Sequence, residues 1–420
     1  MPHTSTEYNF RLKDWLLGFQ TLFIAMGALV LVPLLTGMDP SVALFTAGTG
    51  TLMFQIITKG KIPVFLGSSF AFVPATLYGI QTWGLASTLC GLSLGGLVYF
   101  ILALMIRWKG ERFVHRLLPP IVTGPVIICI GLILAPVAIH MAMGRSGNGE
   151  LQLFPENLSL VVAGVALLTT MLTRLFAYGR LKLIPILAGV IAGYIAALLL
   201  GMVDISPTEA AAWFQIPQFT TPTWHWQSVI LIVPIAVISA IEHIGDIAAI
   251  SAITKQNFIK DPGLHRSLMG DGLATIWASL IGGPPNTTYS EVTAGVAITK
   301  CYNPAIMTWA CIAAILLAFI GKVGIFLQTI PTPVMGGILI LLFGAIAVTG
   351  LNILVQAKED LMKPRAMTIV GIILIIPIGG LSINAGDFAL NGIGLGGIVG
   401  VLLNFFLPNS DAETQDLKQA

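Results

Sequence analysis

Hydrophobic residues form long runs along the chain, separated by short polar segments. Most runs approach the ~20 residues that an α-helix needs to cross the ~30 Å hydrocarbon core of a bilayer. We count fourteen such runs, whose ends are defined to within several residues. They lie at about 15–35, 41–58, 66–80, 84–106, 119–142, 158–176, 183–203, 228–250, 268–283, 287–299, 304–326, 332–350, 366–386 and 388–408. The pattern predicts an all-α polytopic membrane protein with fourteen spans.

The composition agrees with this class. The chain has 420 residues, of which 56% are hydrophobic and 10% charged, whereas a soluble domain carries ~25% charged residues. Its mean hydropathy is +0.90. We therefore expect a lipid bilayer, and not nucleic acid, as its surroundings. Residues 1–14 are polar and no small-residue cleavage pattern follows the first run, so we expect no cleaved signal peptide. The four cysteines predict neither a disulfide framework nor a metal site.

The placement of basic residues orients the spans. With fourteen spans, all of the 21 Lys and Arg residues except Arg145 and Lys322 fall on one side. Basic residues concentrate in cytoplasmic loops, and adding or removing one span in mid-chain would destroy this asymmetry. We predict that both termini are cytoplasmic.

One polar stretch, residues 282–300, interrupts this apolar pattern. Only about 14 residues separate Pro285 from Lys300, fewer than a spanning helix needs, so part of the stretch must be extended. Irregular backbone at membrane depth is tolerated where protein or a water-filled cavity satisfies it, as at the broken spans of secondary transporters. Glu291 lies where the extended part gives way to helix. We predict that it is at the centre of a binding site.

The two halves of the chain resemble each other weakly. LPPIVTG (118–124) resembles IPTPVMG (330–336), and GSSFAF (67–72) resembles NTTYSE (286–291), at corresponding spans and in the same order. Seven spans per half is an odd number, so the second half would be inverted relative to the first. The predicted plan is the 7+7 inverted repeat of secondary transporters, with a site at the repeat interface.

Ionisable residues at membrane depth cluster in spans 8–10, whereas the interiors of spans 5–7 and 12–14 lack charge. The cluster consists of Glu242, His243, Asp246, Asp271 and Glu291. Such residues are costly inside a bilayer and indicate function. The distribution predicts a polar half that binds and an apolar half that serves as a wall.

Glu242 and Asp246 are four residues apart and share one helix face. Two carboxylates in a poorly hydrated cavity cannot both be ionised at low cost, so the pair would provide a proton acceptor near neutral pH. The alternative is a structural pair bonded to backbone amides of the broken spans. We expect His243 to be a packing or hydrogen-bonding partner, and Asp271 to cap or anchor the start of span 9.

Phe70 and Tyr289 occupy corresponding positions in the two similar motifs. They could enclose a flat ring between them, or they could simply be packing residues. The neighbouring hydroxyls are expected to satisfy the freed backbone groups of the broken spans. These are Ser68, Ser69, Thr287 and Thr288.

Four longer motifs resemble those of the nucleobase–ascorbate transporter family, most of all its bacterial uracil permeases. They are KGKIPVFLGSSFAF (59–72), IEHIGD (241–246), DPGLHRS (261–267) and PPNTTYSEVTAGVAITK (284–300). The similarity extends from span 1 to span 12. It implies a multi-pass protein of the bacterial inner membrane, with short antiparallel strands in spans 3 and 10.

The resemblance also implies two domains. Spans 1–4 (1–118) and 8–11 (228–330) would form a core domain. Spans 5–7 (119–227) and spans 12–14 with a short tail (331–420) would form a gate domain, through which a homodimer could form. In such proteins the core moves against the gate and gives the substrate alternating access to each side.

Site residues follow from the same resemblance. Glu242 and Glu291 would hydrogen-bond the amide groups of a nucleobase, with the main-chain amides near Phe70 and Ser290 assisting. Phe70 and Tyr289 would lie around the ring, with Ala28 of span 1 nearby. Glu242 and Asp246 would couple a proton. The supporting residues would be His243, Ser69, Thr288 and Asp271.

Three positions depart from the uracil permeases. Asp246 stands where they carry histidine, and both Asp246 and the Asp271–Gly272 pair resemble xanthine and purine members. Ser290 replaces their usual glycine. Glu291 is followed by Val-Thr-Ala instead of the common asparagine with glycine two residues on, although the glutamate itself resembles the uracil branch.

We therefore predict a proton-coupled nucleobase importer, with uracil as the first candidate and a xanthine or purine proton symporter as the alternative. A more distant alternative is an anion exchanger or channel of the same fold. Such relatives lack the carboxylate pair and often carry an appended soluble domain. An enzyme is not expected, because no nucleophile–base pair and no metal-ligand spacing is present. No cofactor is expected beyond the proton as coupling ion.

Overall fold

Helices follow the predicted apolar runs in a computed structural model of the chain, which describes residues 5–110, 119–358, 360–385 and 388–407. Within this part, seven helices are long and apolar enough, by length and composition, to cross a membrane, the first of them extended by the short helix η1 (Leu12–Asp14). They are α1 (Trp15–Thr36), α2 (Pro40–Ile57), α4 (Leu85–Lys109), α6 (Pro120–Ala142), α7 (Glu156–Phe176), α10 (Trp226–Thr254) and α15 (Thr332–Ala357).

Shorter elements complete the fold. The helices are α3 (Val73–Trp83), α8 (Pro185–Leu199), α9 (Ser206–Ala210), α11 (Leu264–Leu280), α12 (Ser290–Thr299), α13 (Ala305–Ala318), α14 (Gly321–Gln328), α16 (Pro364–Ile378) and α17 (Gly392–Phe406), with single turns η2 (Phe70–Phe72), η3 (Gly179–Leu183) and η4 (Ile259–Gly263). The strands are β1 (Leu66–Ser68), β2 (Asn286–Thr288), β3 (Ser382–Ala385) and β4 (Phe388–Asn391).

The turn between α1 and α2 illustrates how local sequence sets helix ends. Gly37 adopts a φ of 77°, and its N–H donates to the carbonyl of Pro33 and ends α1. Asp39 then accepts a hydrogen bond from the Ser41 amide at 2.8 Å, and Pro40 begins α2. An N-cap aspartate and a proline at the first helical position stabilise a helix start. Three residues therefore suffice to end α1 and begin α2.

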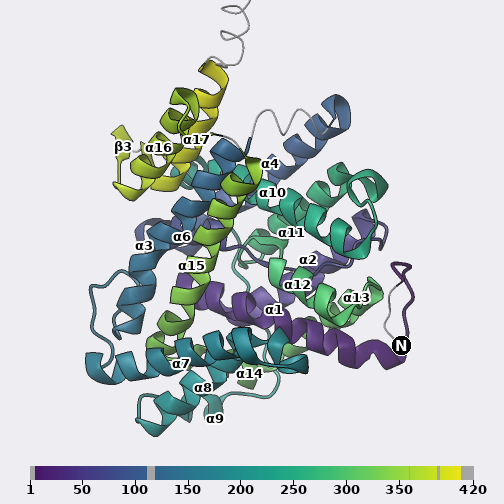
Figure 1. The fold of residues 1–420 in the computed structure, drawn as a ribbon. Coiled ribbons are helices and arrows are strands. Elements are labelled where there is room, and N and C mark those ends of the chain that lie inside the picture. The colour runs from purple at the N-terminus through teal and green to yellow at the C-terminus, as the bar shows by residue number, and fades with distance from the viewer. Residues whose placement is uncertain (1–4, 111–118, 359, 386–387, 408–420) are drawn as a thin grey trace, which may run out of the picture.

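The helices pack in two groups (Figure 1). α6 lies along α15, both contact α7, and α6 also contacts α16, while α8 packs on α7 and α17 on α16. In the other group α4 packs on α10 and α11, α2 on α11 and α13, and α1 on α13. Contacts between the groups are fewer and involve mainly α10 with α17, and α1 with α8.

Three predicted spans differ from the structure, at two places in the chain. The run predicted at 304–326 is divided into α13 and α14, because the backbone at Phe319 and Gly321 pairs with residues 213–215. The ends predicted for the last two spans meet in the antiparallel hairpin β3–β4, so α16 ends at Ile378 and α17 begins at Gly392. In both places a second chain segment satisfies the backbone that leaves the helix.

Residues 200–225, which we call the α8–α10 linker, run across the second group of helices. The Gln215 amide donates to the carbonyl of Phe319 at 3.0 Å, and the Thr220 amide donates to that of Ile281 at 3.2 Å. The side chain of Lys322 donates to the carbonyls of Thr208 and Glu209. The linker is therefore fastened to α14 and to the end of α11.

Candidate functional site

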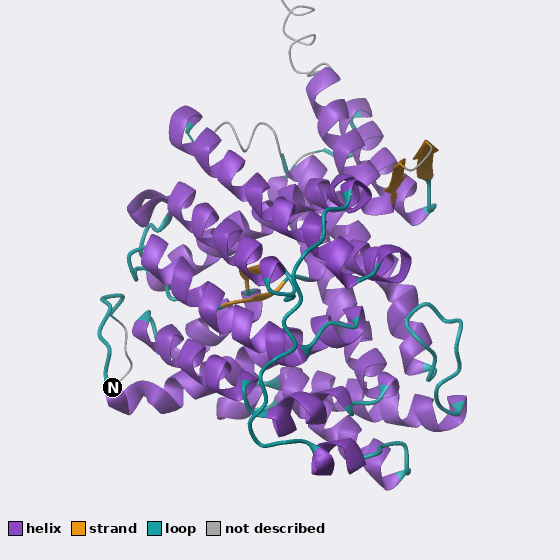
Figure 2. Ribbon diagram, turned by 180° about the vertical axis from the view of Figure 1, so that it is seen from behind, coloured by secondary structure: helices purple, strands orange, loops and turns teal. Residues whose placement is uncertain are grey.

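Two short strands, β1 and β2, pair near the middle of the molecule (Figure 2), and we call them the crossing strands. β1 and β2 are antiparallel, with Gly67 opposite Thr287, and the pair is extended by a hydrogen bond from the Ser69 amide to the carbonyl of Pro285 at 2.9 Å. The predicted antiparallel strands in spans 3 and 10 are confirmed. Each strand is followed at once by a helical turn, so the first N–H groups of η2 and α12 have no intrahelical partner.

Hydrogen bonds to three helices hold β2 in place, one of them from the Thr288 hydroxyl to Asp246 of α10. The Asn286 side chain donates to the carbonyl of Thr46 in α2 at 2.9 Å. In α11, the Thr275 hydroxyl donates to the carbonyl of Asn286 at 2.7 Å, and Asp271 accepts from the Thr287 hydroxyl at 3.1 Å. Each residue of the strand is thus bonded through its own polar groups, as buried extended backbone requires.

Tyr289 locks the two broken segments together. Its hydroxyl donates to the carbonyl of Ser68 at 2.8 Å. Its ring lies against Gly67, where a Cβ atom would come within 2.6 Å of the ring carbons, so this position requires glycine. Only 4% of Tyr289 is exposed. In this arrangement Tyr289 positions the strands, and only Phe70 of the two predicted aromatics remains half-buried.

Asp246 also connects α10 to the broken span. One carboxylate oxygen accepts from the Thr288 hydroxyl at 2.9 Å and the other from the Ser290 hydroxyl at 2.7 Å. Two O–H donors stabilise the ionised carboxylate. Its partners are side-chain hydroxyls, whereas the structural alternative considered from the sequence used backbone amides.

Glu242 and Glu291 differ from Asp246 in having accessible carboxylates. Glu242 lies in α10 one turn before Asp246 and is exposed, and Glu291 lies in the first turn of α12 and is half-buried. No other described residue hydrogen-bonds either carboxylate. A carboxylate near a helix N-terminus is favoured by the helix dipole. The two acids can therefore accept hydrogen bonds from a ligand.

Behind the strands, His243 and Asp271 form a fully buried pair. His243 Nδ1 lies 3.3 Å from Asp271 Oδ2, and its Nε2 lies 3.0 Å from the Ser267 hydroxyl, which donates to the carbonyl of Leu264. Ser267 is thus the acceptor for Nε2–H, and Nδ1 faces the Asp271 carboxylate at ion-pair distance. The pair contacts the strand through Thr287, and Asp271 lies within α11 and does not cap its start.

The remaining predicted residues are more peripheral. Ser69 is buried and its hydroxyl lies 3.2 Å from that of Ser239. Ser290 is exposed at the start of α12. The side chain of Ala28 lies outside the described residues. Among the described residues, no group of three or more His, Cys, Asp or Glu side chains could hold a metal ion.

Sequence reasoning missed Phe343 and Ser239. The ring of Phe343, from α15, meets the edge of Phe70 with 6.3 Å between centroids, so an aromatic contact joins the two groups of helices beside the strands. Ser239 lies one turn before His243 on α10, and this spacing on the same helix was the signal that could have identified it.

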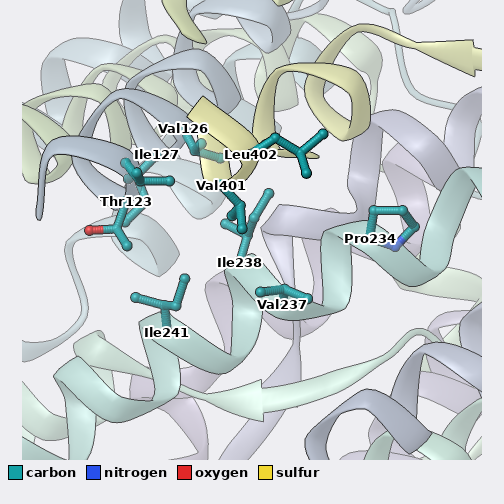
Figure 3. Close-up of a pocket in the computed structure, with 11 residues that line it drawn as sticks. Thr123, Val126, Ile127, Pro234, Val237, Ile238, Ile241, Val401 and Leu402 are labelled. Atoms are coloured by element: carbon teal, nitrogen blue, oxygen red, sulfur yellow. The ribbon is translucent and has the colours of Figure 1, made fainter. Parts of the chain in front are cut away.

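An apolar cavity of about 230 Å³ lies between α6, α10 and α17 (Figure 3). Ile241, next to Glu242 in sequence, lines it together with Ile238, Val126 and Val401. Thr123 is the only residue with a side-chain hydroxyl among its lining. Its apolar lining offers few hydrogen-bonding partners for the polar edge of a ligand. The cavity lies between α10 on one side and α6 and α17 on the other.

The fold is similar to that of solved membrane transporters. The transmembrane domain of a cyanobacterium bicarbonate transporter, BicA, superposes with a TM-score of 0.63 at 15% identity, covering 94% of this chain and 97% of that one. Residues 12–386 match the Permease family Xan_ur_permease, and the chain belongs to this family. It is a permease and not an enzyme.

Two curated relatives are similar over nearly their whole length. The "Probable uracil permease" of Haemophilus influenzae is 47% identical over 99% of both chains. The "Uracil permease" of Bacillus subtilis is 43% identical over 96% of this chain and 94% of its own. The resemblance seen in the sequence motifs is therefore confirmed.

Proposed function

We propose that this chain imports uracil across the bacterial inner membrane together with a proton. The observation that carries the proposal is the pair of accessible carboxylates, Glu242 and Glu291, beside the crossing strands. Uracil presents two ring N–H groups, and each needs an acceptor in a dry site. The names of the relatives support a pyrimidine substrate.

The base would be held on both its edges and its face. Glu242 and Glu291 accept from ring N–H groups, while the unbonded amides at Phe70 and Ser290 donate to ring carbonyls. Phe70 packs on the ring, and α1, which carries Ala28 and contacts β1 and α12, lies beside the site. Tyr289, bonded to Ser68, keeps the two helix starts at the required separation.

Proton coupling would centre on Glu242. Its carboxylate lies one turn from Asp246, whose charge is stabilised by Thr288 and Ser290, so a second charge on Glu242 is disfavoured. The proton shared by the pair then resides mainly on Glu242, and a bound base holds it there until release. Asp246 contributes its negative charge and its hydrogen bonds to Thr288 and Ser290 of the broken span.

Transport would proceed by movement of a core domain against a gate domain. We assign spans 1–4 and 8–11 to the core and spans 5–7 and 12–14 to the gate, in a 7+7 inverted repeat of fourteen spans with cytoplasmic termini. The separate packing of the two groups of helices supports this division. The contacts of the α8–α10 linker favour a domain boundary near residue 200, since it is bonded to core elements. A homodimer would form through the gate.

Xanthine is the second candidate, favoured by Asp246 and by the Asp271–Gly272 pair. An anion substrate is disfavoured, because the carboxylates at the site would repel it.

Uptake of radiolabelled uracil and xanthine into vesicles, with and without an inward proton gradient, tests the proposal. We expect gradient-driven accumulation of uracil with proton flux in the same direction. Equal uptake without a gradient would contradict proton coupling, and preference for xanthine would reassign the substrate. Uptake of neither base would contradict nucleobase transport.

A further inference from the structure

A second cavity, of about 470 Å³, lies beneath the α8–α10 linker. Its floor is the α1–α2 turn, with Met38 and Asp39, and one wall is α14 with Ile325 and Gln328. The cavity lies apart from the apolar one between α6 and α10. By the orientation proposed above, it opens on the outer face of the membrane.

The roof of this cavity is fixed in place. The Gln218 amide donates to Asp39 Oδ2 at 3.1 Å, and the Gly321 amide donates to the carbonyl of Trp213 at 3.1 Å. The ring of Phe219 also meets the edge of Phe45 in α2, with 5.3 Å between centroids. The cavity is therefore preformed, which lowers the entropic cost of binding.

The polar groups in this cavity match a neutral amide. Three glutamines line it, Gln215, Gln218 and Gln328, and none of their side chains hydrogen-bonds another described residue. Asp39 is the only charged residue among the described lining residues, and the Ser41 and Gln218 amides already bond its two oxygens. A carboxamide offers a donor beside an acceptor and can pair bidentately with the edge of a base.

Apolar side chains complete the cavity. Leu34, Ile216 and Ile325 provide flat contact surface among the polar groups. This combination of apolar walls and a few polar groups is typical of small-molecule sites. With no basic residue in the described lining, an anion has no counter-charge there. The occupant that fits is a neutral planar ring with amide edges.

The position of the cavity relates it to the central site. Pro33, in its lining, follows Ala28 by five residues, or about 7.5 Å along α1. Gly282, also in the lining, precedes Asn286 of β2 by four residues. The same two segments of chain therefore lead from this cavity to the strands.

We propose that this cavity is a second, weaker site that captures a nucleobase on the outer face before it reaches the central site. The proposal rests on the proposed nucleobase transport. Neutral amide pairs that remain near water bind a ligand less strongly than the central site, where Glu291 is a charged acceptor. A weak site allows rapid transfer onward.

The test uses 5-fluorouracil as probe and follows its fluorine resonance on adding purified protein. The Glu291→Ala variant removes the central site, so any remaining binding reports other sites. We expect it to retain a Kd of about 1–10 mM. Adding Gln218→Ala and Gln328→Ala to the Glu291→Ala variant should weaken its residual affinity for 5-fluorouracil at least about fivefold, since two neutral hydrogen bonds are lost. Gln256→Ala, an exposed glutamine after α10, is the matched control and should change nothing.

The outcomes separate this proposal from the proposed function. If wild type binds the probe and Glu291→Ala binds none at about 10 mM, the second site is wrong while nucleobase transport stands. Residual binding that survives loss of both glutamines also overturns the assignment. If wild-type protein itself binds no nucleobase, the proposed function fails.

Discussion

The crossing strands and the α6–α15 pair are both buried, yet they are held together differently. Between α6 and α15, glycines let the backbones touch: a Cβ atom at Gly131 would lie 2.5 Å from the carbonyl oxygen of Phe343, and one at Gly350 would lie 2.5 Å from that of Gly124. Small residues at such contacts are a general device of membrane helices. Around the strands, the contacts are side-chain hydrogen bonds, such as those that Asp246 accepts from the hydroxyls of Thr288 and Ser290.

This difference indicates where a ligand can act. Close backbone packing has no charge for a proton or substrate to change, so the α6–α15 pair should remain one rigid surface. The strands depend on directional bonds to carboxylates, whose strength changes with protonation. The following predictions disturb one region or the other.

The largest effect is expected from Glu291→Ala in the polar region. One charge-assisted hydrogen bond to the base is lost, at about 1.5–3 kcal/mol, and the ring N–H left unpaired costs about a further 1–3 kcal/mol, so uracil affinity should fall more than about 100-fold. Calorimetric titration with uracil measures this, and an unchanged melting temperature shows that the protein is folded. Unchanged affinity would exclude Glu291 from the site.

Gly337→Ala should have the next largest effect, on stability. Its Cβ atom would lie 2.2 Å from the carbonyl oxygen of Ala163 in α7, so α15 must shift, at a cost of about 1–3 kcal/mol. Gly344→Ala on the same helix is the control, because nothing lies within 4 Å of its Cβ position. Thermal unfolding in detergent compares them, and equal melting temperatures would contradict close packing as the cause.

Asp246→Asn tests the coupling within the polar region. Loss of the charge beside Glu242 should reduce accumulation driven by a pH gradient about tenfold, as one pKa unit of interaction corresponds to a factor of ten. Exchange of uracil without a gradient should continue. Proton flux per uracil in vesicles is the measurement. Unchanged accumulation and pH dependence would leave coupling to Glu242 alone.

The smallest effect is expected from Tyr289→Phe. It removes the hydroxyl that donates to Ser68 and keeps the ring against Gly67, so stability should fall by about 0.5–1.5 kcal/mol. Uracil affinity should change less than about tenfold. A loss as large as that of Glu291→Ala would mean that Tyr289 contacts the base directly.

The sequence predicted much of this fold, because hydrophobic run length and charge placement are local properties. The shortage of residues between Pro285 and Lys300 predicted extended chain before Glu291, and the structure has β2 there. The break between α13 and α14 could not be predicted, because it depends on pairing with residues about 100 positions earlier.

At the site, the sequence by itself determined that acids gather on spans 8–10 and that Glu242 and Asp246 share a helix face. Helical periodicity shows which residues share a helix face, but it does not show which side chains on different elements hydrogen-bond to each other. Only the tertiary structure decided that the hydroxyls of Thr288 and Ser290 donate to Asp246. It also decided that the Tyr289 hydroxyl donates to the carbonyl of Ser68, and that the carboxylates of Glu242 and Glu291 stay available to a ligand. Those pairings depend on how β2 packs against α10 and β1, where each buried polar group must find its own partner.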